Sequence, residues 1–275
     1  NGEFVLTEAH NIQFNYTGLP VITSAVTIEG HGSTVRRDDP WTTPNFRILP
    51  SSANGALTLR DTTISNGRLY DVADYASWEN ASDGGGILSL GTLVISGSTI
   101  EGNSVAPYAG YGGGIFAAGP TTITNSGISD NHAGAEFGAG GGINATGPIT
   151  ITSSEILDNS ADGYYGCVGG GINVDGQATI VDTIIAGNYV TGGEGTCRGG
   201  GVNVYGQATI IGSTISGNVA LPYLELFSSE FHPGLGGGLN NQGTTLLVNS
   251  TVSGNTASYG GGVTNLRYGT LTIVQ

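Results

Sequence analysis

The sequence predicts an all-β fold, a single-domain right-handed parallel β-helix (a β-solenoid) of roughly nine to ten coils. Three observations predict it. Glycine triplets recur about every thirty residues, short β-type patterns follow each triplet, and residues typical of helices are scarce. The triplets are Gly84–Gly86, Gly112–Gly114, Gly140–Gly142, Gly169–Gly171, Gly199–Gly201, Gly236–Gly238 and Gly260–Gly262. Self-similarity at this period indicates a solenoid in which each unit forms one coil.

Each unit carries two kinds of apolar position that would face the interior. One directly follows the triplet, at Ile87, Ile115, Ile143, Ile172, Val202, Leu239 and Val263. The other is a pair of residues five positions apart, at Leu59/Ile64, Ile95/Ile100, Ile123/Ile128, Ile151/Ile156, Ile180/Ile185, Ile210/Ile215 and Leu247/Val252. Because equivalent strands of neighbouring coils pair in parallel, we expect these residues to form continuous apolar columns.

One β-helix domain is expected over residues 1–275, with two parts of different regularity. Residues 1–83 would form irregular N-terminal coils with insertions, and residues 84–275 would form regular coils of the triplet type. The last residues, GTLTIVQ, match half a coil, in which Ile273 is the first member of an apolar pair. We therefore expect the chain to belong to a longer polypeptide or to a stacked assembly.

The charge and hydropathy of the chain argue against two classes of partner. The 275 residues include 21 Asp+Glu against 7 Lys+Arg, which gives a formal net charge of −14. Nucleic-acid phosphates would be repelled by this charge, so we expect no nucleic-acid partner. No run of about 18 apolar residues is present, so we expect no membrane span.

The two cysteines occupy the same position of successive units, in CVGGGINV and CRGGGVNV. Strands one coil apart lie about 4.8 Å from each other, which is within the Cα separation that a disulfide accepts. We therefore predict a disulfide between Cys167 and Cys197, and with it an oxidising, extracytoplasmic environment. Two stacked reduced thiols are the alternative.

Asparagine forms two columns in the repeat. The first contains Asn103, Asn131, Asn159, Asn188, Asn218 and Asn255, and the second contains Asn144, Asn173, Asn203 and Asn240. An asparagine amide can bond the next coil and tolerates the left-handed backbone region at a corner. A structural ladder is the prediction for these amides, and no catalytic residue is assigned.

Variation between units is concentrated in the segments that lead to each triplet. These segments hold many of the aromatic residues, and we predict a binding face there, made of Tyr108, Tyr111, Phe137, Tyr164, Tyr165, Tyr189, Tyr223, Phe227, Phe231 and Tyr259. Such side chains could stack on sugar rings or pack against another protein, or they could cover the backbone of their own loops.

A larger insertion before the first triplet is acidic. It contains Asp71, Asp74, Glu79 and Asp83, which are weak candidates for metal ligands. Four nearby carboxylates suit a hard cation such as calcium, although their spacing fits a solvated acidic loop better. No cofactor is otherwise required.

The chain resembles the bacterial secreted and surface right-handed parallel β-helix proteins of the polymorphic outer-membrane-protein and choice-of-anchor type. The resemblance covers Val21 to Gln275 and is carried by strings such as LPVITSAVTIEGHGSTVRRD, GTLVISGSTIEGNSVA, IIGSTISGNVA and NSTVSGNTASYGGGV. It implies an extracellular or cell-surface location and an adhesive role.

The first functional interpretation is therefore an extracellular structural or adhesive β-solenoid, as a self-assembling filament subunit or with a loop-bearing face for proteins or glycans. Its partners would be further copies, by end-to-end stacking, or other surface proteins and glycans. The alternative is a polysaccharide lyase or hydrolase of the pectate-lyase-like architecture. The tripeptide Gly30-His31-Gly32 resembles part of a polygalacturonase motif, and it lacks that motif's companions here. Ice or mineral binding through Thr122, Thr124, Thr150 and Thr152 is a third hypothesis.

Overall fold

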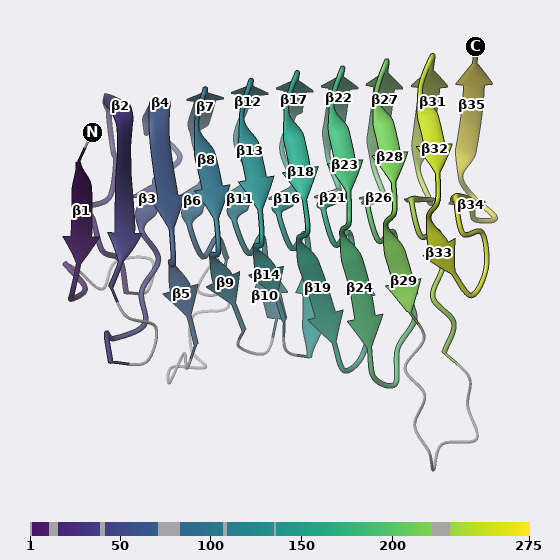
Figure 1. Cartoon of the computed structure of the whole chain (residues 1–275), viewed down its shortest axis with the longest axis horizontal. Coiled ribbons are helices and arrows are strands. Elements are labelled where there is room, and N and C mark those ends of the chain that lie inside the picture. Colours follow the sequence, from purple (N-terminus) through teal and green to yellow (C-terminus); the bar gives the residue numbers. More distant parts are fainter. Residues whose placement is uncertain are drawn as a thin grey trace.

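The computed structural model of the chain describes residues 2–10, 16–38, 42–70, 83–106, 109–134, 136–221 and 232–275. Within these residues the secondary structure is entirely β, and no helix there is long and apolar enough to cross a membrane. All strand pairs of the described residues are parallel, and successive coils lie side by side from the N-terminal to the C-terminal end (Figure 1). The predicted β-solenoid is confirmed.

Four parallel sheets form the sides of the solenoid. The largest contains β1 (Glu3–Leu6), β2 (Ala25–Arg37), β4 (Ala56–Ser65), β7 (Thr92–Ser96), β8 (Thr99–Glu101), β12 (Thr121–Thr124), β13 (Gly127–Ser129), β17 (Ile149–Thr152), β18 (Glu155–Leu157), β22 (Gln177–Val181), β23 (Ile184–Ala186), β27 (Gln207–Ile211), β28 (Thr214–Ser216), β31 (Thr244–Val248), β32 (Thr251–Ser253) and β35 (Thr270–Val274). The eight-stranded sheet contains β3 (Leu49–Ser51), β6 (Ile87–Ser89), β11 (Ile115–Ala117), β16 (Ile143–Ala145), β21 (Ile172–Val174), β26 (Val202–Val204), β30 (Leu239–Asn241) and β34 (Val263–Asn265).

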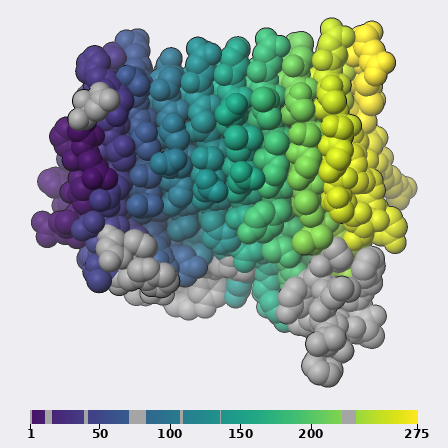
Figure 2. Space-filling view, viewed as in Figure 1, coloured from purple at the N-terminus to yellow at the C-terminus, as the bar shows by residue number. Residues whose placement is uncertain are grey.

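The two smaller sheets complete each coil. The seven-stranded sheet contains β5 (Arg68–Leu69), β9 (Ser104–Val105), β14 (His132–Ala133), β19 (Ser160–Gly163), β24 (Tyr189–Gly192), β29 (Val219–Leu221) and β33 (Thr256–Ala257). The four-stranded sheet contains β10 (Ala109–Tyr111), β15 (Phe137–Ala139), β20 (Cys167–Val168) and β25 (Cys197–Arg198). The coils pack against one another as successive bands on the surface (Figure 2).

The solenoid makes about 8 turns, slightly fewer than the nine to ten coils expected. Strands β2, β4, β7, β12, β17, β22, β27, β31 and β35 succeed one another in the largest sheet. Before β2, the described residues contribute only part of a coil. Strand β1 pairs with the second half of β2, and Ile22 forms a bridge to Ser51.

The interior is filled by the predicted apolar columns. Ile95, Ile123, Ile151, Ile180 and Ile210 occupy equivalent register positions in neighbouring strands, and all five are fully buried. The residues that follow the triplets lie in the same continuous core cluster. Burial of these columns supplies the main stabilisation of each coil, because a buried aliphatic side chain contributes about 1.5–3 kcal/mol. Outside this core, Ile273 of β35 is 58% exposed.

Steric constraints explain why the triplets consist of glycine. Gly112 adopts a φ of 67°, a left-handed value that favours glycine. A Cβ on Gly114 would lie 2.7 Å from the carbonyl oxygen of Gly142 and 2.9 Å from Cγ of Asn131. The triplet is therefore a close-packed corner, as the repetition predicts, and no phosphate-binding loop is needed to explain it.

The first asparagine column is a continuous buried ladder at the corner between the largest and seven-stranded sheets. Asn159 donates from Nδ2 to Oδ1 of Asn188 (3.0 Å) and to the carbonyl oxygen of Ile128 (2.9 Å). Its Oδ1 accepts from the backbone N–H and from Nδ2 of Asn131, both at 3.0 Å. Equivalent bonds link Asn103, Asn131, Asn159, Asn188, Asn218 and Asn255. The ladder therefore satisfies backbone groups that the corner would otherwise leave unpaired.

A hydroxyl ladder that was not predicted runs beside it. The backbone N–H of Ser126 donates to Oγ of Ser154 (3.2 Å), and Oγ of Ser126 donates to the carbonyl oxygen of Thr124 (2.8 Å). The ladder consists of Ser98, Ser126, Ser154, Thr183, Ser213 and Ser250. These hydroxyls bridge the step between the two halves of the largest sheet.

The tripeptide Gly30-His31-Gly32 has a structural explanation. The register between β2 and β4 shifts between Glu29 and Ser33, so the tripeptide forms an irregularity inside a long strand. His31 and Gly32 have φ values of 51° and 76° there. A β-bulge of this kind accommodates extra residues in one strand, and it favours residues such as glycine that can adopt a positive φ.

Candidate functional site

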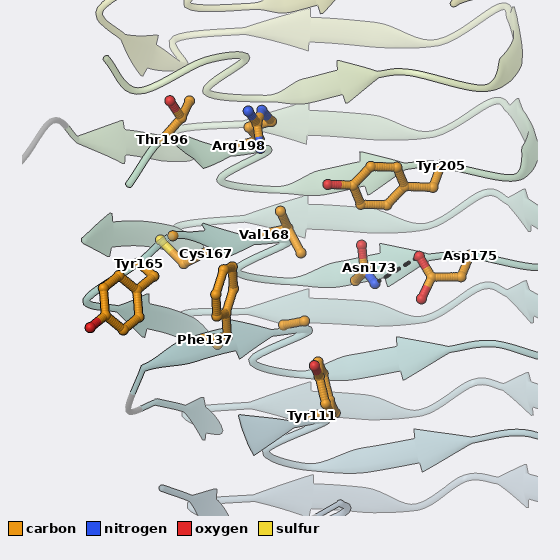
Figure 3. Close-up of a pocket in the computed structure, with 13 residues that line it drawn as sticks. Tyr111, Phe137, Tyr165, Cys167, Val168, Asn173, Asp175, Thr196, Arg198 and Tyr205 are labelled. Atoms are coloured by element: carbon orange, nitrogen blue, oxygen red, sulfur yellow. Dashed lines mark hydrogen bonds between the residues drawn. The ribbon is translucent and has the colours of Figure 1, made fainter. Parts of the chain in front are cut away.

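A groove of about 330 Å³ lies on the outer surface, where the four-stranded sheet meets the ends of β21 and β26. Its walls are Tyr111, Phe137, Tyr165, Val168, Thr196 and Arg198 on one side, and Asn173, Asp175 and Tyr205 on the other (Figure 3). From Tyr111 in β10 to Arg198 in β25 the groove crosses three coil-to-coil steps, which is about 14 Å at the usual strand spacing.

One wall of the groove is aromatic. The rings of Phe137 and Tyr165 lie 6.3 Å apart between centroids at an interplanar angle of 32°. Tyr164 meets Tyr165 edge-to-face at 5.0 Å, and its hydroxyl donates to Oε1 of Glu194 (2.7 Å). These contacts hold the ring of Tyr165 in place while its side chain stays exposed.

The opposite wall carries amide and carboxyl groups. Nδ2 of Asn173 donates to Oδ1 of Asn144 (2.8 Å) and to Oδ1 of Asp175 (3.2 Å), the second of which Figure 3 marks. Burial raises the pKa of the Asp175 carboxyl above its ordinary value, and the hydrogen bond from Asn173 opposes that shift. Tyr205 occupies the register position of Asp175 one coil further on, beside the carboxyl.

The second asparagine column passes this wall as a ladder of side chains. Each Nδ2 donates at 2.8 Å to Oδ1 of the preceding coil, from Asn173 to Asn144, from Asn203 to Asn173 and from Asn240 to Asn203. All four residues are buried. At the C-terminal end of the ladder, Oδ1 of Asn240 is buried and has no hydrogen-bond partner in the described residues.

The predicted disulfide is confirmed, and it holds the groove wall. Cys167 and Cys197 are register partners in β20 and β25, with their Cα atoms 4.5 Å apart. Arg198 follows Cys197 directly, so the crosslink fixes the backbone that carries this guanidinium. Nε of Arg198 is buried and has no hydrogen-bond partner in the described residues.

No protein-family model, no curated protein and no solved structure matches this chain. The site is therefore interpreted from its own residues.

The structure brings together part of the predicted binding face. Tyr111, Phe137 and Tyr165 line the groove, and Tyr164 supports it. Tyr189 is exposed on β24 of the seven-stranded sheet, outside the groove, and Tyr259 lies near the C-terminal end beside Leu235. The remaining members of the prediction, Tyr108, Tyr223, Phe227 and Phe231, are outside the described residues.

Five groove side chains were missed by the sequence analysis, namely those of Val168, Asp175, Thr196, Arg198 and Tyr205. A signal for two of them is present, because INVDGQATI and VNVYGQATI place Asp175 and Tyr205 at equivalent positions of adjacent units. An exchange of a carboxyl for an aromatic ring inside two otherwise similar units marks a position that is not purely structural.

Asp83 is the one predicted metal candidate within the described residues, and it faces an arginine. Nη2 of Arg47 donates to the main-chain oxygen of Asp83 (2.6 Å). Burial raises the pKa of Asp83 to about 7 and lowers that of Arg47 to about 10, and the attraction between the two charges opposes both shifts. No group of three or more potential ligands occurs among the described residues, and Asp71, Asp74 and Glu79 lie outside them.

A Ser–His–Asp trio lies on the seven-stranded sheet, away from the groove. Nδ1 of His132 is 2.9 Å from Oγ of Ser160, and Nε2 is 2.9 Å from Oδ1 of Asp162. The second contact is short, but its angle is not that of a hydrogen bond, because Oδ1 of Asp162 has no hydrogen-bond partner among the described residues. Ser160 is only 7% exposed. A buried hydroxyl in the register of two stacked coils fits a link between the coils better than a nucleophile.

Proposed function

We propose that this protein is an extracellular structural or adhesive β-solenoid that binds a glycan in the aromatic groove. The observation that carries the proposal is the pairing of exposed aromatic rings with hydrogen-bonding side chains across one concave surface. A sugar ring has apolar faces, which stack on aromatic rings, and a rim of hydroxyls, which bond to amide, carboxyl and guanidinium groups.

The dimensions of the groove support an extended ligand. Its aromatic and polar residues come from successive coils and repeat at the strand spacing, so a chain of sugar units lying along the solenoid axis would meet several of them. The walls are set by paired strands and a disulfide, which reduces the ordering that binding requires.

The extracellular location is part of the same proposal. A disulfide that bridges adjacent coils is typical of proteins in oxidising compartments.

Binding is favoured over the hydrolase alternative by the number of acidic groups in the groove. Its described lining includes a single carboxyl, that of Asp175. Glycoside hydrolysis ordinarily uses two carboxyl groups on either side of the bond that is cleaved.

End-to-end assembly remains a second proposal and rests on exposed edges. β35 lies at one margin of the largest sheet and exposes Ile273 and Val274, and β1 at the other exposes Phe4 and Val5. Unpaired parallel edges of this kind are templates for another strand. Light scattering that shows only monomers at rising concentration would exclude this assembly.

Calorimetry with a panel of neutral and acidic oligosaccharides tests the glycan proposal. Tyr205→Ala removes a groove ring and should weaken binding about fivefold, because stacking on one ring contributes about 1 kcal/mol. The matched control is Tyr189→Ala, because Tyr189 has the same 43% exposure outside the groove and should leave affinity unchanged. Equal effects of the two variants, or no binding of any saccharide, would refute the proposal.

A further inference from the structure

Arg198 differs from every other cationic side chain of the protein. The other six arginines contact a carboxyl group, a backbone carbonyl or an aromatic ring: Arg36 with Glu3 and Asp38, Arg37 with the carbonyl of Asn66, Arg47 with the carbonyl of Asp83, Arg60 with Glu29, Arg68 with the ring of Tyr70 and Arg267 with the ring of Tyr268. Arg198 has no carboxyl group within ion-pair distance in the part of the chain that the structure describes.

The guanidinium of Arg198 has lost part of its contact with water, and no described residue replaces the hydrogen bond of its Nε. The residue is half-buried, and its Nε is fully buried with no hydrogen-bond partner among the described residues. Leaving such a donor unsatisfied is unfavourable, and more so when the group is charged. An arginine in a groove that meets no carboxyl group among the described residues has an environment suited to an external anion.

The position of Arg198 matches the glycan groove. Figure 3 shows it between Thr196 and Tyr205, on the coil that follows Tyr165. Its neighbour Cys197 is crosslinked to Cys167, so the strand that presents the guanidinium is held in register with β20. A saccharide that lies along the groove from the aromatic wall would therefore pass the guanidinium.

We propose that the ligand of the groove is a saccharide that bears a carboxylate, and that Arg198 binds this carboxylate. This assignment rests on the proposed function of the groove in glycan binding. The planar guanidinium presents a fork of N–H donors that fits the two oxygens of a carboxylate.

The surroundings of Arg198 favour widely spaced carboxylates over densely charged polymers. Asp175 lies on the facing wall of the groove, and the chain has a formal net charge of −14. A densely sulfated polymer would be repelled along most of its length. A saccharide with a single carboxylate per repeating unit can place that group at Arg198 and keep neutral rings elsewhere.

Calorimetric titration with matched acidic and esterified saccharides tests the assignment. The probes are a hyaluronan oligosaccharide, which has one carboxylate per disaccharide, and alginate and polygalacturonate oligosaccharides, which have one on every ring, each also as its methyl ester, with a heparin oligosaccharide as the sulfated comparison. The hyaluronan acid should bind the wild-type protein about tenfold more tightly than its own ester, and more tightly than heparin.

Arg198→Gln should lower the affinity for that acid to the affinity of its ester and should leave the ester unaffected. Arg198→Lys should fall between the two, because lysine keeps the charge and loses the fork. Arg60→Gln is the matched control, since it removes the same charge from an exposed ion pair on the largest sheet and should preserve the preference for the acid. Unchanged melting temperatures would show that each variant is folded.

The outcomes separate this assignment from the proposal on which it rests. If acid and ester bind equally, or if Arg198→Gln weakens both equally, the groove binds glycans and the carboxylate assignment is wrong. Tighter binding of heparin than of the hyaluronan acid would also overturn it. If no saccharide of either kind binds, the glycan groove itself fails, and the assignment fails with it.

Discussion

The two asparagine columns are both buried and both repeat once per coil, yet their amides bind different groups. In the first column, Asn159 bonds the carbonyl of Ile128 and the backbone N–H of Asn131 in addition to neighbouring side chains. In the second column, Asn173 bonds only the side chains of Asn144, Asn203 and Asp175. The donors also point in opposite directions along the axis, toward the C-terminal coil in the first column and toward the N-terminal coil in the second.

This difference separates a structural column from a column that belongs to a site. The first column satisfies the backbone of a corner, so each of its members is required by its neighbours. In the second column, Asn173 lines the groove and bonds Asp175, and Asn240, outside the groove lining, has an Oδ1 with no hydrogen-bond partner among the described residues. Recurrence of one residue type in a repeat protein therefore does not show that all copies have one role.

The largest expected effect is on the first column. Asn159→Ala should lower the free energy of unfolding by about 4 kcal/mol, because it leaves the carbonyl of Ile128 and the N–H of Asn131 buried without partners. Asn173→Ala should lower it by about 2 kcal/mol, since it leaves Oδ1 of Asn144 and Nδ2 of Asn203 without partners but no backbone group. Urea denaturation of both variants measures the difference. Equal losses would mean that the two columns are energetically alike.

The disulfide allows a second comparison of the two regions, because it crosslinks the groove wall and does not crosslink the first asparagine column. Replacing Cys167 and Cys197 by alanine should lower the free energy of unfolding by about 3 kcal/mol, as expected for the loss of a disulfide between residues 30 positions apart. Hydrogen exchange should quicken in β20 and β25 while the backbone N–H of Asn159 stays protected. Uniform loss of protection along the chain would contradict a local role for the crosslink.

Gly142→Ala disturbs the first column without changing an asparagine. The added Cβ would lie 2.7 Å from the carbonyl oxygen of Gly171 and 3.0 Å from Cγ of Asn159, so we expect a loss of about 2 kcal/mol. Gly127→Ala is the control, because nothing lies within 4 Å of its added Cβ. Thermal unfolding should show a lower melting temperature for the first variant and little change for the second. A matching decrease for Gly127→Ala would point to a general requirement for glycine.

Stability should also depend on pH, through the buried carboxyl of Asp83. The pKa of Asp83 is raised from 3.8 to about 7, so between these values the folded protein holds a proton that the unfolded chain releases. The free energy of unfolding should therefore fall as pH rises from about 4 to about 7, by up to about 1.4 kcal/mol per pH unit, and level off above. Asp83→Asn should remove this contribution. Identical pH profiles of the two proteins would show that Asp83 ionises alike in both states.

The sequence predicted those features that the repeat imposes on every coil. Triplets such as Gly140–Gly142 and inward residues such as Ile123 follow from close packing and burial, and both recur often enough to be recognised. The pairing of Cys167 with Cys197 followed from their equal position in adjacent units. The hydroxyl of Ser126 was not predicted, because a serine between two short strands gives no indication of which backbone group it bonds.

The candidate site was predicted only where residues stood out from the repeat. Tyr111, Phe137 and Tyr165 lie in variable segments and were predicted to share a binding face, and all three line the groove. Arg198 lies within a regular unit, where it looks like ordinary variation, and Tyr205 is marked only by its exchange with Asp175 in the adjacent unit. Their grouping depends on the concave angle between two sheets, and that angle is not expressed in the spacing of residues along the chain.

The sequence by itself determined the coil, its apolar columns and the register of the disulfide, because each depends on contacts between equivalent positions one unit apart. Only the tertiary structure decided which outward side chains share a surface, that one asparagine column serves the backbone and the other adjoins a groove, and that Arg198 has no carboxyl partner among the described residues. The physical reason is that contacts along the solenoid axis repeat with the sequence, whereas contacts across a corner depend on how the sheets are inclined to each other.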